Sequence, residues 1–94
     1  MSRALSGQKT VTTAGSAEAL GSQTINAALM IKALDSNTDV VAIGNDGGGD
    51  VSLANGLRLE PGDSLVLEFV GCLASLMLDA ALDGEGVCWL ALNA

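Results

Sequence analysis

The sequence predicts an all-β protein: a single compact β-sandwich or jelly roll of about eight short strands with a flexible N-terminal arm. Three observations lead to this prediction. Turn signals recur at short intervals, apolar and polar residues alternate between several of them, and 94 residues provide one core and no second one. We assign residues 1–7 to the arm and residues 8–94 to the sandwich domain.

The first half of the chain supplies three expected strands. Residues 8–13 and 38–43 are rich in Thr, Val and Ile, which favour extended backbone. Residues 25–34 are rich in Ala, Leu and Met, which favour helices in isolation. This segment has no helical apolar stripe and is flanked by turn signals at strand spacing, so we expect a strand here as well.

The dipeptide Asn55-Gly56 suggests a β-hairpin in the middle of the chain. Two-residue hairpin turns need positive φ at both central positions, and Asn followed by Gly adopts that conformation most readily. We therefore expect residues 50–54 and 57–59 to be neighbouring strands.

A second turn is expected where Pro61 precedes Gly62, since Pro presets the second turn position and Gly supplies positive φ at the third. In the segment that follows, Leu65, Leu67 and Phe69 alternate with Ser, Val and Glu. This period of two predicts a strand with one face against the core.

The C-terminal part follows the same rhythm. Residues 73–82 are again rich in Ala, Leu and Met, and we expect a strand there for the reasons given for residues 25–34. Residues 83–86, Asp-Gly-Glu-Gly, predict a turn. The apolar run at residues 87–92 then predicts a buried final strand.

The charge is one-sided, with four Lys or Arg against eleven Asp or Glu and a net charge of −7. Nucleic-acid binding needs clustered cations, so we expect no nucleic-acid partner. Many acids fall near expected strand ends and turns: Asp35, Asp39, Glu60, Asp63, Asp79 and Asp83. They suit a solvated rim, or else docking onto a basic surface.

No signal peptide is expected, because residues 1–7 contain no apolar stretch. The longest apolar run, residues 69–78, is too short to span a bilayer, so we expect no membrane partner and synthesis in a cytoplasm. Cys72 and Cys88 have apolar neighbours. We expect both to be reduced core residues, with a disulfide as the alternative.

We expect no enzymatic activity, catalytic residue, cofactor or metal. The chain has no His, which removes His-dependent nucleophile systems and His metal sites. A hydrolase that uses a carboxylate pair stays formally open, but no spacing marks such a pair. The Gly-rich residues 44–50 offer Asn45, Asp46 and Asp50 as calcium ligands, yet the EF-hand pattern is missing. An exposed connection between strands is the favoured interpretation of this loop.

Several segments resemble small β-sandwich structural proteins of tailed bacteriophages, such as capsid decoration or cement proteins. The resemblance runs from Thr10 to Leu92 and rests mainly on turn chemistry. Its motifs are residues 10–15 (Thr-Val-Thr-Thr-Ala-Gly), 18–20 (Glu-Ala-Leu), 31–34 (Ile-Lys-Ala-Leu), 37–38 (Asn-Thr), 41–44 (Val-Ala-Ile-Gly), 55–56 (Asn-Gly), 59–64 (Leu-Glu-Pro-Gly-Asp-Ser), 76–79 (Leu-Met-Leu-Asp) and 83–87 (Asp-Gly-Glu-Gly-Val). The motif at residues 59–63 is also similar to a cupin hairpin, but the metal-binding His residues of cupin enzymes are missing.

The resemblance implies a virion protein, made in the host cytoplasm, that binds the major capsid protein on the outer capsid surface and stabilises the shell. It further implies a homo-oligomer or many lattice-bound copies. We expect the interface to include the arm residues Ser2, Arg3, Ala4 and Leu5, one strand edge, and Trp89 in a core or interface role. The alternative is a receptor- or glycan-binding jelly-roll module of a phage tail or fibre, with Trp89 as a sugar-stacking ring.

Overall fold

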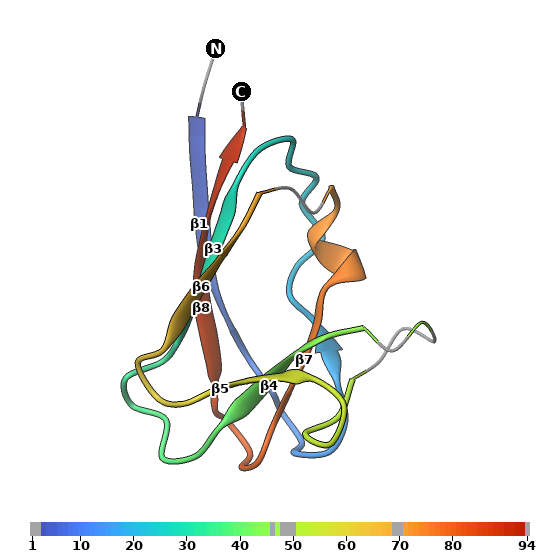
Figure 1. The fold of residues 1–94 in the computed structure, drawn as a ribbon, viewed down its shortest axis with the longest axis vertical. Coiled ribbons are helices and arrows are strands. Elements are labelled where there is room, and N and C mark those ends of the chain that lie inside the picture. Colours follow the sequence, from blue (N-terminus) through green and yellow to red (C-terminus); the bar gives the residue numbers. More distant parts are fainter. Residues whose placement is uncertain (1–2, 46, 48–50, 69–70, 94) are drawn as a thin grey trace.

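The computed structural model describes residues 3–45, 47, 51–68 and 71–93. The described chain folds into two antiparallel sheets of four strands each, in the orders β1-β8-β3-β6 and β2-β7-β4-β5 (Figure 1). The elements are β1 (Arg3–Thr10), β2 (Glu18–Ala19), β3 (Leu29–Ala33), β4 (Val41–Gly44), β5 (Leu57–Leu59), β6 (Ser64–Leu67), the 3₁₀ turn η1 (Leu73–Ser75), β7 (Met77–Ala80) and β8 (Gly86–Asn93).

The strand pairing is that of a jelly roll. The first strand pairs with the last, the second with the seventh, the third with the sixth and the fourth with the fifth. Further pairings of β3 with β8 and of β4 with β7 join these strand pairs into the two sheets. This arrangement of two Greek keys confirms the predicted all-β sandwich.

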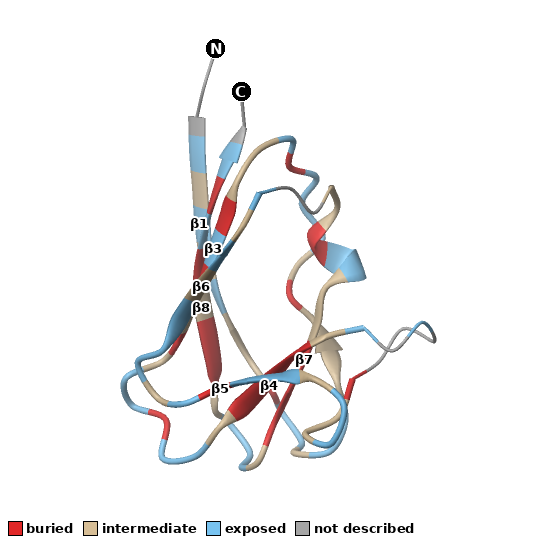
Figure 2. Ribbon diagram, in the orientation of Figure 1, coloured by how far each residue is buried: buried red, intermediate tan, exposed pale blue. Residues whose placement is uncertain are grey.

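The core lies between the sheets and is built almost entirely from aliphatic side chains. Along β8, Val87, Trp89 and Ala91 are buried while Leu90 and Leu92 are exposed, which is the alternation of a strand with one face inward (Figure 2). The buried cluster comprises Val11, Leu20, Ile25, Leu29, Ile31, Ala33, Val41, Ile43, Leu59, Leu73, Leu78, Ala80, Val87, Trp89 and Ala91.

Two predicted turns are confirmed. Gly62 has a φ of +86°, and the Asp63 N–H donates to the Glu60 carbonyl at 2.9 Å, as a turn with Gly at its third position requires. Gly84 has a φ of +82°, and its N–H donates to the Val11 carbonyl at 2.7 Å. The alternation after the first turn is also present as far as Leu67, since Leu65 and Leu67 pack against the core, while Phe69 lies outside the described residues.

The prediction of a flexible arm is wrong for residues 3–7. They form most of β1, which pairs without interruption with β8 from Arg3 opposite Asn93 to Thr10 opposite Gly86. Leu5 packs against the core, so burial of this side chain adds to the backbone pairing. The pairing partners lie at the other end of the chain, between Trp89 and Asn93, and no local pattern signals them. Met1 and Ser2 lie outside the described residues.

The expected hairpin at Asn55-Gly56 is also wrong. Residues 53–55 form a turn, and β5 pairs with β4. The Ser52 carbonyl accepts the N–H groups of both Asn55 and Gly56, and no residue other than glycine has positive φ in the described chain. Gly56 is needed for space instead: a Cβ there would lie 2.7 Å from Val51 Cγ2 and 2.9 Å from Ala42 Cβ.

The two Ala-, Leu- and Met-rich segments contain strands, but shorter ones than expected. Residues 25–34 provide β3, and residues 73–82 provide the 3₁₀ turn η1 followed by β7. The short strand β2 was not expected, and residues 51–54 are not a strand. The number of strands therefore agrees with the sequence pattern, although one member differs.

Candidate protein-binding face

One face of the sheet β1-β8-β3-β6 points away from the core, and we call it the outer face. In an antiparallel pair, residues directly opposite each other point to the same side of the sheet. Because Leu90 points outward, so do its partners Ser6 on β1 and Met30 on β3. The outer face comprises Ala4, Ser6 and Gln8 of β1, Cys88, Leu90 and Leu92 of β8, Met30 and Lys32 of β3, and Ser64 and Val66 of β6.

The outer face carries a row of exposed apolar side chains. Val66, Met30 and Leu90 are cross-strand neighbours with exposed fractions of 65%, 42% and 46%. Leu92, one outward position further along β8, is 46% exposed. Of the six large apolar side chains that are exposed among the described residues, four lie on this face. Such a concentration on one side makes this face the candidate interaction surface.

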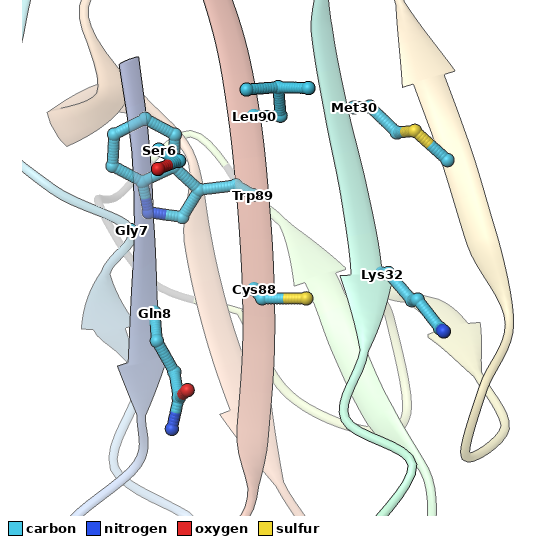
Figure 3. A pocket seen from close by; sticks show the side chains of 8 residues that line it. All are labelled: Ser6, Gly7, Gln8, Met30, Lys32, Cys88, Trp89 and Leu90. Atoms are coloured by element: carbon cyan, nitrogen blue, oxygen red, sulfur yellow. The ribbon is translucent and has the colours of Figure 1, made fainter.

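A shallow pocket of about 600 Å³ opens on the outer face (Figure 3). Its lining residues are Ser6, Gly7, Gln8, Met30, Lys32, Cys88, Trp89 and Leu90. Figure 3 shows Ser6, Leu90 and Met30 at one level across three strands, with Gln8, Cys88 and Lys32 at the next. The small residues between the longer ones leave this hollow, which can take an apolar side chain of a partner. Its apolar rim becomes polar towards Lys32, whose Nζ lies 3.3 Å from an Asp35 carboxylate oxygen.

Charge is distributed unevenly between the two sheets. The strands β1, β8, β3 and β6 contain none of the eleven acids, but they contain three of the four cations. On the outer face as defined above, Lys32 is the charged side chain. In a chain of net charge −7, this sheet offers an apolar surface free of the acids that surround it.

Several of the acidic side chains form hydrogen bonds that hold the loops and the other sheet. Carboxylate oxygens accept backbone N–H groups from loop residues: Glu18 from Thr12 at 2.6 Å, Asp79 from Gly15 at 2.9 Å, Asp83 from Ala14 at 2.7 Å, and Glu85 from Thr38 at 2.7 Å and Asp39 at 3.2 Å. Asp79 is only 2% exposed, so the solvated rim expected for the acids does not include it. These bonds satisfy backbone donors that the strands leave unpaired.

Two of these carboxylates are held in their ionised form. The hydrogen bond from the Thr38 N–H lowers the pKa of Glu85 below its ordinary value of 4.5. The hydrogen bond from Lys9, at 2.9 Å, and then that from the Thr12 N–H lower the pKa of Glu18 in the same direction. Both acids therefore act as charged clamps on neighbouring loops.

The residues that the sequence indicated for the interface are not brought together. Ala4 lies on the outer face and Arg3 lies in β1, whereas Leu5 packs inward and Ser2 lies outside the described residues. Trp89 is 6% exposed and faces the core, where a Cβ added at Gly7 would lie 2.8 Å from its Cζ2. Trp89 therefore has the core role.

Met30, Val66, Leu90 and Leu92 were missed by the sequence reasoning. A signal existed, because residues 87–92 are apolar at almost every position. In a sheet covered on one side only, such a strand must expose half of its apolar side chains.

Both cysteines are free thiols, as expected, but they are only half-buried, and Cys88 faces outward. At the Gly-rich loop, Asn45 Oδ1 accepts the Gly47 N–H at 2.8 Å, while Asp46 and Asp50 lie outside the described residues. Within the described ranges, no three Cys, Asp or Glu side chains gather as metal ligands. Nor does any helix of that part of the chain have the length and apolarity to cross a membrane.

The outer face can bury apolar surface against another protein, and it is the part of the described molecule best suited to do so. No family model, curated protein or solved structure matches this chain.

Proposed function

We propose that this chain is a non-enzymatic virion structural protein that binds the outer surface of a capsid through its outer face and stabilises the shell. One observation carries the binding proposal: four exposed apolar side chains share one acid-free sheet face. The capsid is proposed as partner because the turn motifs of the sequence resemble those of decoration proteins of tailed phages. The sandwich fold is compatible with that resemblance.

Attachment to a shell would also stabilise the protein itself. Anything that binds only the folded chain shifts the folding equilibrium by mass action. A small domain with an aliphatic core and few aromatic residues gains much from such binding. The same linkage would stabilise the capsid subunits that it joins.

The test is a particle-binding experiment with variants of the outer face. Capsids that lack this protein are prepared from the virus that encodes the chain. Purified protein is added to them, and the particles are pelleted to measure how much protein binds. We expect the double variant Met30→Ser and Leu90→Ser to bind at least about tenfold more weakly, since a partner would lose two apolar contacts.

The matched control is the double variant Leu57→Ser and Leu82→Ser. These leucines are 59% and 46% exposed but lie off the outer face, on β5 and in the loop after β7. The control should bind as the wild type does, and both double variants should keep the wild-type melting temperature to within a few degrees. Equal binding by the wild type and the outer-face variant would refute the proposal.

The alternative, a receptor- or glycan-binding module of a tail or fibre, has less support. It depended on an exposed ring at Trp89, which faces the core. Finding a few copies of the protein at the tail tip, and none on the shell, would favour this alternative.

A further inference from the structure

Strand β1 is an edge strand whose second side is open. Within the described residues, the sheet order places it at the margin, where β8 is its one partner strand. The Leu92 N–H donates to the Ala28 carbonyl, so the even-numbered residues of β8 direct their backbone groups towards β3. The odd-numbered residues of β8 therefore form their backbone hydrogen bonds with β1, at positions such as Leu5 and Gly7. It follows that Ala4, Ser6, Gln8 and Thr10 direct their N–H and C=O groups away from the sheet.

Just beyond the end of β1, one backbone N–H that points to the open side does have a hydrogen-bond partner. The outward N–H of Thr12 is bonded by the Glu18 carboxylate at 2.6 Å. From Thr10 back to Ala4 the open edge has the length of a complete pairing site, and the register with β8 contains no bulge that would twist the edge away.

The other edges of the two sheets are short by comparison. Strands β2, β5 and β6 have two, three and four residues, whereas β1 has eight. Natural proteins protect long edges with Pro, charged side chains or bulges, because an open edge pairs readily with another strand. On the outer face, β1 presents the uncharged Ala4, Ser6 and Gln8, and Lys9 is engaged by Glu18.

We propose that β1 pairs antiparallel with β1 of a second copy about a two-fold axis at Gly7. This register places Ser6 opposite Gln8 and Ala4 opposite Thr10, so the outward backbone groups of both copies meet in about eight hydrogen bonds. A two-fold axis at Ser6 would instead place Arg3 opposite Lys9, which opposes like charges.

Charge favours a second copy over a basic partner. Two chains of net charge −7 repel each other wherever their acids meet, but the strands of this sheet contain none of the eleven. The edge is therefore where two copies can approach with least repulsion, whereas a basic partner would be attracted to the acidic loops. Pairing would join two four-stranded sheets into one of eight strands with a continuous outer face. This proposal does not depend on the capsid assignment.

Amide hydrogen exchange of the isolated protein tests the pairing at single residues. We expect the Ser6 and Gln8 amides to be protected at high protein concentration and to lose that protection on dilution. The Leu5 and Gly7 amides, bonded to β8, should stay protected throughout and serve as the internal control. Exchange of Ser6 and Gln8 at unprotected rates at every concentration up to the millimolar range would overturn the proposal. Protection that appears only after a different protein is added would overturn it too.

A substitution adds a second test. Ser6→Pro removes one outward N–H and leaves the bonds to β8 in place, and proline is tolerated at such positions of edge strands. We expect its dimer dissociation constant, from analytical ultracentrifugation, to rise more than tenfold, while Ser6→Thr dimerises as the wild type does. A Ser6→Pro protein that keeps its circular dichroism spectrum and dimerises unchanged would contradict the proposal. If Ser6→Pro unfolds, the exchange experiment on the wild type still decides.

Discussion

The two sheets of this sandwich maintain their structure in different ways. The sheet β1-β8-β3-β6 contains both eight-residue strands, no acids and an apolar outer face. The sheet β2-β7-β4-β5 has strands of two to four residues, and the loops around it are held by carboxylates that accept backbone N–H groups. The first sheet depends on long backbone ladders and burial, whereas the second depends on charged hydrogen bonds. The acidity of the chain is thus partly structural, and the candidate binding face is the one that carries no acids.

The largest effect should come from the inner side of the first sheet. Trp89 and Leu90 are neighbours in β8 on opposite faces, 6% and 46% exposed. Trp89→Ala should lower the free energy of unfolding by about 3–5 kcal/mol, because it leaves a large cavity. Leu90→Ala, the control, should cost no more than about 1 kcal/mol. Urea denaturation measures both. Similar losses for the two variants would mean that the outer face is not free in the isolated protein.

A smaller effect is expected where a loop meets the first sheet. The buried Asn37 donates from Nδ2 to the Gly86 carbonyl at 2.8 Å and accepts the Gly86 N–H at 3.2 Å. Asn37→Ala should destabilise the fold by about 1–3 kcal/mol, since it leaves a buried N–H without its partner. The control Asn55→Ala removes an exposed bond to the Ser52 N–H and should cost less than about 1 kcal/mol. Equal losses in urea denaturation would show that this side-chain clamp is dispensable.

The smallest effect concerns the carboxylate clamps and depends on pH. The pKa of Glu85 is lowered in the folded protein, so its ionised form stabilises the fold at neutral pH. That stabilisation is present above the ordinary pKa of 4.5 and is lost as the pH falls through the lower folded-state pKa. Glu85→Gln should therefore lower the melting temperature at pH 7, with a difference from wild type that shrinks below pH 4.5.

The control for this measurement is Glu60→Gln at an exposed position of the 60–63 turn. Its melting temperature at pH 7 should stay close to that of the wild type. If Glu85→Gln melts with the wild type at pH 7, the contrast between the two sheets is weaker than the hydrogen bonds suggest.

The fold class was predictable from local chemistry, but several pairings were not. The turns at Gly62 and Gly84 need positive φ, which glycine signals directly in the sequence. The pairing of β1 with β8 joins opposite ends of the chain, and nothing in residues 3–7 announces its partner. At Asn55-Gly56 a strong hairpin signal was overridden, because β5 gains more by pairing with β4 and burying Leu59.

The candidate face was harder to predict than the fold. The sequence predicts a flexible arm that includes Arg3, Ala4 and Leu5, and it leaves Trp89 with a core or an interface role. The outward direction of Met30 and Leu90 depends on strand register, and a slip of one residue would reverse it. In residues 87–92 both faces are apolar, so the sequence shows that a strand is present but leaves its inward side undecided.

The pairing of Arg3 with Asn93 brings the two ends of the described part of the chain side by side (Figure 1). A linker of a few residues could therefore connect them, and the polypeptide could be opened instead at the exposed Asp83-Gly84 turn. Such a circularly permuted protein would keep every neighbour in both sheets while turning the union of β1 and β8 from a long-range contact into a local hairpin. Because local contacts form faster than distant ones, the rearranged chain should fold more quickly than the original.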